Sequence, residues 1–236
     1  MEQVVSRAKK VIANNQPDLA ISMCEEFLKT EPNAVVLWDV LANAHFLKKD
    51  NGQAAMCFEK VVELAPQNPK SHQNLGVFYQ IIGKFNEALQ CYQRAASCDA
   101  YYAPAYNGAG IVLMTVGQLD TAQQYFAKAL QLDPQFADAY ANLAHVFFSK
   151  GQLPAAAQSY AKANALNPDL KSAVANRFYS LAMMCDWSWL DAFSRVAKTL
   201  GIEGEEVTPF SLLPLEDAPE RQLARCRKFV SAKFGQ

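Results

Sequence analysis

The sequence lacks a dominant sign of charge and any long hydrophobic run. Among its 236 residues, 22 are lysine or arginine and 23 are aspartate or glutamate, so the formal net charge is −1. This balance gives no reason to expect nucleic acid or an anionic membrane as a partner. No apolar stretch approaches the roughly 20 residues of a membrane span, and the opening MEQVVSRAKK lacks the apolar core of a signal peptide. We expect a cytoplasmic protein.

The motifs of catalysis and metal binding are also missing. The sequence contains no GxSxG, no HExxH and no glycine-rich phosphate loop after a strand. None of its six cysteines forms a CxxC pair, and Cys24, Cys57 and Cys91 are interpreted as small packing residues of second helices in a reduced protein. We therefore expect no catalytic residues, no metal and no cofactor in this chain, and no enzyme activity.

What the sequence does contain is an internal repeat. The stretch Gly117 to Pro134, GQLDTAQQYFAKALQLDP, places Ala122, Phe126 and Ala129 on one helical face. The same pattern returns at a step of 34 residues, counted from Met1. Position 20 is alanine in five successive repeats, position 24 is bulky in four of them, and position 32 is proline except at Ala100. The pattern predicts paired helices, with the small residues allowing close approach.

On these residues the chain resembles the tetratricopeptide repeat family. The family's first helix has a bulky residue at position 4, leucine at 7, a small residue at 8 and an aromatic at 11. These positions hold Trp38, Leu41, Ala42 and His45 in the second repeat, and Tyr140, Leu143, Ala144 and Phe147 in the fifth. The resemblance implies an all-α fold, a right-handed superhelix of helical hairpins with a concave side. Its repeats would span residues 1–34, 35–68, 69–102, 103–136 and 137–170, with a partial unit at 171–184.

The turns between paired helices follow the same register, with two expected exceptions. Glycine precedes the second helix at Gly83, Gly117 and Gly151, where a turn needs a positive φ. Asn15 stands at this place in the first repeat, and asparagine tolerates that conformation. In the second repeat we expect a shifted turn, with Gly52 three places later.

Residues 185–236 are expected to end the array. Phe178 replaces the small residue at position 8, so close packing stops there. Trp187, Leu190, Phe193 and Val196 predict a capping helix. A loop over residues 201–218 and an amphipathic helix from Pro219, with Leu223, Cys226, Val230 and Phe234 on one side, would follow. The basic residues of this last helix are either a solvated face, which is favoured, or a basic patch: Arg221, Arg225, Arg227, Lys228 and Lys233.

The C-terminal part has a second resemblance. Cys185-Asp186-Trp187, then Val207 to Leu213 (VTPFSLL), then Gln222-Leu223-Ala224, is similar to the junction in bacterial, SPINDLY-type relatives of the protein O-linked N-acetylglucosamine transferases. In that family a tetratricopeptide array leads through such a junction into a two-lobed glycosyltransferase domain. The resemblance implies that residues 185–236 lead toward a catalytic domain that is not in this chain, so no catalytic residue is carried onto it.

The concave side is the expected functional surface. Positions 2, 5, 6, 9, 12 and 13 of each first helix should line it. The transferase resemblance implies a ladder of asparagines at position 6 that holds an extended peptide by its backbone. Val40 and Gly108 interrupt this ladder, and the asparagines are equally consistent with solvated polar residues. The candidate contacts are Asn74, Asn107, Asn142, His145, Asn176 and Tyr179.

Two functions follow from these residues and resemblances, and a purely structural role in an assembly stays open as a third. In the first, the chain is a protein-interaction scaffold that binds extended polypeptide as the substrate-recognition arm of such a glycosyltransferase. In the second, it is a free-standing adaptor of the co-chaperone type that grips a terminal carboxylate, for which Lys9, Asn43 and Lys70 are a partial match. Both make a polypeptide the partner, and neither sets an oligomeric state.

Overall fold

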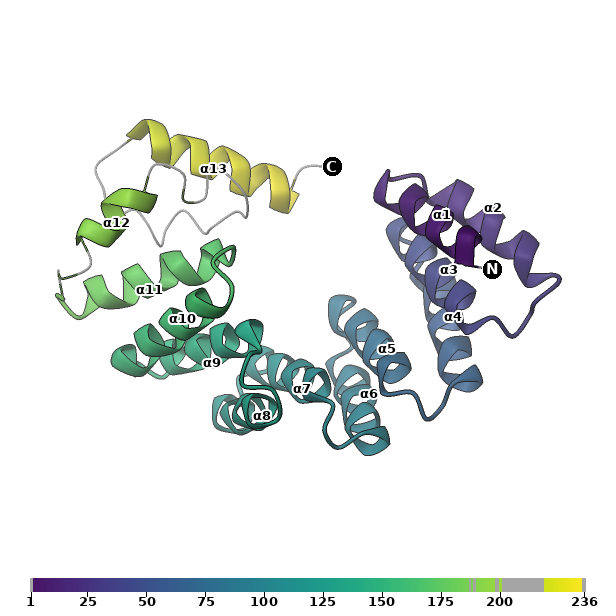
Figure 1. Cartoon of the computed structure of the whole chain (residues 1–236), viewed down its shortest axis with the longest axis horizontal. Helices are drawn as coiled ribbons and strands as arrows, with labels where there is room; N and C mark the ends of the chain where they lie inside the picture. Colours follow the sequence, from purple (N-terminus) through teal and green to yellow (C-terminus); the bar gives the residue numbers. More distant parts are fainter. Residues whose placement is uncertain (1, 187, 189, 198–199, 201–218, 235–236) are drawn as a thin grey trace. The chain divides into compact units, whose positions relative to one another are not determined.

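The computed structural model describes residues 2–186, 188, 190–197, 200 and 219–234. Over these residues the secondary structure consists of thirteen helices (Figure 1), none of them long and apolar enough for a membrane span. Their bounds are α1 Glu2–Ala13, α2 Pro17–Leu28, α3 Val35–Leu47, α4 Asn51–Leu64, α5 Pro69–Ile81, α6 Phe85–Cys98, α7 Ala103–Thr115, α8 Leu119–Leu132, α9 Ala137–Ser149, α10 Leu153–Leu166, α11 Lys171–Met183, α12 Leu190–Val196 and α13 Pro219–Phe234. Trp187 and the predicted junction Val207 to Leu213 lie outside the described residues.

The helices confirm the predicted 34-residue period. First helices begin at Val35, Pro69, Ala103, Ala137 and Lys171, and second helices begin at Pro17, Asn51, Phe85, Leu119 and Leu153. Both series advance by 34 residues at every step. The all-α repeat fold expected from the sequence is therefore confirmed.

The turn inside each hairpin repeats with the same period. Positive φ values occur at Gly83, Gly117 and Gly151, and at Asn15, where φ is 56°. The expected shifted turn of the second repeat is wrong. Lys49 takes the positive φ, 62°, at the regular place, and Gly52 lies inside α4. The hairpin geometry thus holds Lys49 in a conformation that lysine rarely adopts.

Helices approach closely at the small residues that the sequence singled out. The five alanines of position 20 are fully buried: Ala20, Ala54, Ala88, Ala122 and Ala156. The bulky residues at position 24 fill the space beside them, and Tyr92, Phe126 and Tyr160 are each at most 2% exposed. A larger side chain at position 20 would force the paired helices apart.

A side chain at position 4 joins consecutive repeats. Trp38 Nε1 donates to the Pro32 carbonyl over 2.7 Å, and His72 Nε2 lies 2.8 Å from the Pro66 carbonyl. Because a carbonyl only accepts, His72 carries its proton on Nε2. The hydroxyl of Tyr106 donates to the Ala100 carbonyl in the same way. Tryptophan, histidine and tyrosine thus make the same contact with the end of the preceding repeat. His72 therefore has a structural role in joining these repeats.

The chain forms two compact units, Met1–Val112 and Leu113–Gln236, with the boundary inside α7. The first unit has a core of buried residues from α1 to α5, against which Cys91 of α6 packs. At its centre the ring of Phe78 lies 5.8 Å from that of Phe46 in an edge-to-face arrangement and 5.3 Å from that of Phe58. Such aromatic contacts fix α5 against the preceding hairpin.

Tyr92 is wedged between two glycines of the first unit. A Cβ built on Gly108 would lie 2.3 Å from the Tyr92 ring, and one built on Gly76 would lie 3.1 Å from it. The hydroxyl of Tyr92 donates to Gln80 Oε1 over 2.9 Å, which holds the ring in place. Gly108 is therefore required by packing, and this explains why it interrupts the polar residues of position 6.

In the second unit, His145 belongs to the packing of a hairpin. Its Nδ1 lies 2.9 Å from the hydroxyl of Tyr160, and the two rings meet edge to face with centroids 5.4 Å apart. Tyr160 is 1% exposed and lies among Ala144, Ala156 and Ala163. Burial lowers the pKa of His145 below its ordinary value.

The capping segment forms in part as predicted. Phe193 of α12 is 4% exposed and packs edge to face on Phe178 at 5.3 Å, which explains the large residue at that position. The cap also buries Ala197 and Leu200. Leu190 was expected on the buried face but is 48% exposed.

The final helix α13 differs from its predicted orientation. Leu223 and Val230, which were expected together on the apolar side of an amphipathic helix, are 51% and 53% exposed. Arg225, expected on a solvated face, is fully buried and donates through Nε to the Leu200 carbonyl at 2.7 Å and through Nη2 to the Ala197 carbonyl at 2.5 Å. The guanidinium donates hydrogen bonds to carbonyls that follow α12. These bonds, rather than the apolar residues of α13, decide which side of the helix is buried.

Two glycine substitutions separate packing from helix propensity. We predict that Gly108→Ala destabilises the protein by about 1–3 kcal/mol, because its methyl group would overlap the ring of Tyr92. Gly52→Ala meets only Asp50 Oδ1 at 3.7 Å and should stabilise α4 by up to about 1 kcal/mol. Urea unfolding monitored by circular dichroism measures both, and equal effects of the two substitutions would contradict the assignment.

The burial of His145 predicts a pH-dependent stability. Its pKa is lower in the folded than in the unfolded protein, so the unfolded state binds the proton more readily. Stability should fall as the pH decreases below the ordinary histidine pKa of about 6.5. In His145→Gln, the urea midpoint should depend less on pH between 8 and 5 than in the parent protein. If the two pH profiles are parallel, burial does not govern this histidine.

Candidate binding groove

Two adjoining pockets lie on the first helices of the N-terminal unit. The polar pocket, of about 250 Å³, is lined by Lys9, Val35, Val36, Asp39, Val61, Asn68, Lys70, Ser71 and Asn74. The apolar pocket, of about 210 Å³, is lined by Asn43, Phe46, Phe58, Asn74, Val77, Phe78 and Ile81. Asn74 belongs to both. We call the two together the first-helix groove.

The helical register explains why these side chains share a face. On α5, Lys70, Asn74, Val77 and Ile81 are spaced four, three and four residues apart, which is one stripe of a helix. The stripe begins with polar residues near the N-terminus of α5 and ends with apolar ones near its C-terminus. The groove is thus polar at one end and apolar at the other.

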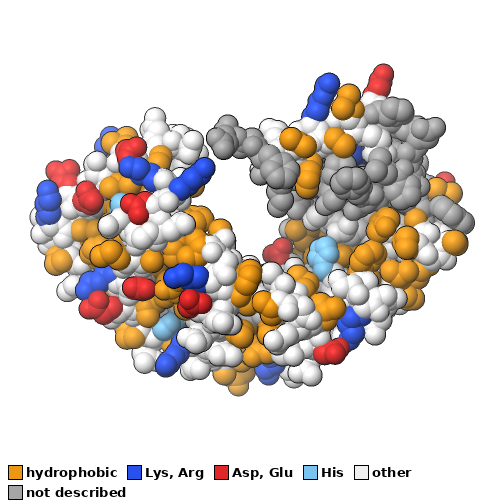
Figure 2. Space-filling view, turned by 180° about the vertical axis from the view of Figure 1, so that it is seen from behind, with side chains coloured by type: hydrophobic (Ala, Val, Ile, Leu, Met, Phe, Trp, Pro, Cys, Tyr) orange, Lys and Arg blue, Asp and Glu red, His pale blue; other side chains and the backbone are white. Residues whose placement is uncertain are grey.

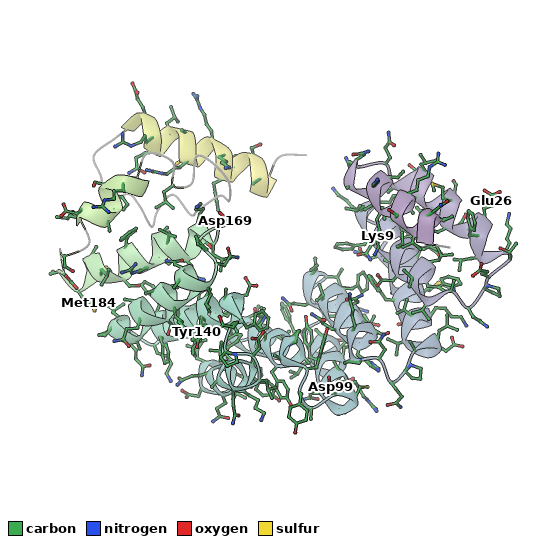
Figure 3. The ribbon with its side chains drawn as sticks, in the orientation of Figure 1. Lys9, Glu26, Asp99, Tyr140, Asp169 and Met184 are labelled. Carbon is green, nitrogen blue, oxygen red and sulfur yellow. The ribbon has the colours of Figure 1, made fainter. Side chains whose placement is uncertain are left out.

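The polar end contains two unpaired cations and one engaged carboxylate. Asn74 Nδ2 donates to Asp39 Oδ1 over 2.7 Å, which links α5 to α3. Lys9 and Lys70 are exposed, and neither ammonium pairs with a carboxylate within the described part of the chain. Figure 3 shows Lys9 and Glu26 on opposite sides of the α1–α4 group. Two lysines against one carboxylate leave this end of the groove with net positive charge.

The apolar end of the groove exposes large aliphatic side chains, which folded proteins usually bury. Ile81 is 59% exposed and Val77 is 41% exposed, above a floor of the three phenylalanines. Figure 2 shows the N-terminal unit with hydrophobic side chains gathered among basic and acidic ones. An apolar patch rimmed by polar residues is typical of an interaction site.

The two predicted contacts of the first unit, Asn74 and Asn107, lie in different environments. Asn74 is half-buried in the groove, but its amide already donates to Asp39. Asn107 of α7 is only 9% exposed, so little of it is left for a ligand. Val40, at position 6 of the second repeat, is 2% exposed and belongs to the core. Position 6 is thus partly a packing position.

The other four predicted contacts lie in the second unit, all half-buried. Asn142 and His145 lie on α9, and Asn176 and Tyr179 lie on α11. The Tyr179 ring lies 5.6 Å from that of Phe148, which joins these two first helices, and the Asn176 carbonyl accepts from the Ser180 hydroxyl. The four therefore share two neighbouring first helices, with His145 engaged by Tyr160 as described above.

The apolar half of the groove was not predicted from the sequence. Phe46, Val77 and Ile81 stand at positions 12, 9 and 13, which were expected to line the concave side. The signal was an apolar residue at a groove position, where a solvated polar residue would be expected. Within the described residues no group of histidine, cysteine, aspartate and glutamate side chains could hold a metal ion.

Comparisons with known proteins agree with this architecture. Three family models, each described as tetratricopeptide repeat, match residues 36–68, 57–90 and 113–176. In a comparison with curated protein sequences, no relative matches the chain.

Several solved structures are similar. PilF of Pseudomonas aeruginosa has a TM-score of 0.69 at 16% identity, covering 83% of this chain and 90% of its own. A thermophilic TPR protein of Thermus thermophilus has a TM-score of 0.63 at 21% identity, covering 77% and 98%. YrrB, described as a TPR protein with an unusual peptide-binding site, has a TM-score of 0.53 at 24% identity, covering 72% and 88%. Together with helix starts that recur every 34 residues, the matches show that this chain is built of tetratricopeptide repeats.

Proposed function

We propose that the chain is an interaction scaffold, without enzyme activity of its own, that holds an extended polypeptide in the first-helix groove. The observation that carries this proposal is that the two pockets share Asn74 and together are lined by side chains from three successive first helices. Such a groove has the elongated form that a single extended strand of polypeptide requires. The description of YrrB as peptide-binding supports the same class of ligand.

The binding is expected to be weak. A hydrogen bond to an amide contributes only about 0.5–1.5 kcal/mol net, and the ligand loses conformational freedom on docking. We therefore expect Kd values on the order of 10⁻⁶ M or above. Weak and reversible binding suits a scaffold that exchanges its partners.

Blocking the groove tests the proposal. Asn43 is exposed on α3 and lines the apolar pocket, so Asn43→Trp should fill the groove and weaken binding at least about tenfold. Leu19 is 47% exposed on α2 outside the groove, and Leu19→Trp is the matched control, which should bind as the parent does. Binding of a fluorescent library of unstructured peptides, measured by anisotropy, gives the result. Equal binding by both variants, or no binding by the parent, would rule the proposal out.

The transferase resemblance leads to a narrower proposal, in which the scaffold is the substrate-recognition arm of a glycosyltransferase. It rests on the sequence around residues 185–236, because the matched family models cover repeats only. On this proposal Asn142 and Asn176, on adjacent first helices, contact the backbone of the substrate. A gene that continues past Gln236 into an α/β nucleotide-sugar domain would support it, and a stop codon there would contradict it.

A specific observation favours the adaptor as a second candidate. Lys9 and Lys70 line the same pocket, so the two cations that could grip a terminal carboxylate come together there. The carboxylate of Asp39 in that pocket would repel such a ligand, and Asn43 lies in the neighbouring pocket instead. Amidating the C-terminus of a bound peptide distinguishes this candidate, since only terminal recognition would lose affinity.

A further inference from the structure

The first-helix groove has a direction, because its charged and apolar ends lie at opposite ends of α5. We propose that it selects a polypeptide segment in which an acidic side chain and a large aliphatic side chain are separated by a few residues. This inference rests on the proposed function and names its ligand more closely. It differs from recognition of the peptide backbone by asparagines, which would accept almost any sequence.

The aliphatic part of the ligand is indicated by the apolar pocket. Val77 and Ile81 form an exposed rim, and Phe46, Phe58 and Phe78 lie beneath them. The rings of Phe46 and Phe58 are both held by Phe78, so the floor is preformed. A leucine or isoleucine side chain would bury apolar surface on both sides of the contact and release the water that covers it.

The acidic part is indicated by charge. Lys9 and Lys70 face the polar pocket from α1 and α5, and Asp39 faces it from α3. The hydrogen bond from Asn74 holds the Asp39 carboxylate toward α5, while neither lysine has an ion-pair partner among the described residues. A carboxylate on the ligand would therefore meet an excess of positive charge.

The length of α5 sets the spacing between the two groups. Lys70 and Val77 are separated by about 10 Å along the helix axis, and Lys70 and Ile81 by about 16 Å, at a rise of about 1.5 Å per residue. An extended chain advances about 3.3 Å per residue, so three to five residues cover this span. A segment with its carboxylate and its aliphatic group three to five residues apart can thus satisfy both ends of the groove.

A set of capped peptides tests the inference on the full chain. Twelve-residue peptides, acetylated and amidated to remove terminal charges, carry glutamate and leucine four residues apart in a serine–glycine background. Matched peptides replace glutamate by glutamine, leucine by serine, or place the two residues side by side. We expect each change to weaken binding at least about fivefold, measured by anisotropy. The glutamate effect should shrink when salt is raised, because exposed charges are screened.

Variants of the protein assign each effect to its end of the groove. Lys9→Gln with Lys70→Gln should abolish the preference for glutamate over glutamine and keep the preference for leucine. Ile81→Ser should do the reverse. Matched controls are Lys10→Gln, next to Lys9 and also exposed, and Leu19→Ser, an exposed aliphatic residue on α2. Both controls should leave the preferences unchanged, and unaltered thermal unfolding confirms that each variant is folded.

The outcomes separate this inference from the function on which it rests. If all the peptides bind equally well and Asn43→Trp weakens every one, the groove holds polypeptide without selecting it, and the inference is wrong. If no peptide binds the parent protein, with or without a free C-terminus, the proposed function fails with it. If the capped peptides do not bind but the same glutamate–leucine peptide with a free C-terminus does, the carboxylate is terminal, and the selection of an acidic side chain is overturned.

Discussion

The structure depends on the close approach of two helices at a small residue. At position 20 of all five full repeats an alanine with no exposed surface lets the second helix lie against the first. In four of these repeats a bulky side chain four residues later fills the space beside it. One hairpin cannot cover its own apolar face, so hairpins must stack. Stacking sets first helices beside first helices, and the position-4 side chains of the second, third and fourth repeats each bond to the end of the repeat before. The groove is a consequence of that order, because it collects residues from equivalent positions of neighbouring repeats.

The chemistry of the groove is set by which of those residues are already engaged. The amide of Asn74 donates to Asp39, and Asn107 is almost covered, so these asparagines are poorly placed to hold a peptide backbone. What the groove of the N-terminal unit offers instead is two lysines at one end and an aliphatic rim over phenylalanines at the other. Side-chain recognition of this kind gives selectivity, because a ligand without an acidic or an aliphatic side chain loses the contacts at one end of the groove. The second unit offers a different surface, in which His145 and Tyr179 are part of ring contacts between helices.

Much of the fold could be predicted from the sequence because the same pattern of small and bulky residues recurs in five repeats. Helix starts, buried alanines and the turn at Asn15 all follow from that period. The failures have local physical causes. Glycine is favoured in a left-handed turn but is not required, so Lys49 occupies the position and Gly52 misled the prediction. Arg225 is buried because the carbonyls that follow α12 need hydrogen-bond donors. The pattern of apolar residues in α13 does not indicate this burial. The positions expected to line the concave side include residues of the groove, but the prediction weighed the amides at position 6 and passed over the apolar residues at positions 9, 12 and 13.

The central claim is that repeat packing produces a ligand groove on the first helices of the N-terminal unit. Backbone amide chemical-shift mapping, with the labelled full chain and the glutamate–leucine peptide, tests it most directly. We predict that the shifts change along α3 and α5, strongest at Asn43, Val77 and Ile81, with a smaller effect at Lys9. The exposed residues of α2 and α4, such as Leu19 and Met56, should be unaffected. Shift changes confined to those second helices, with none along α5, would contradict the claim.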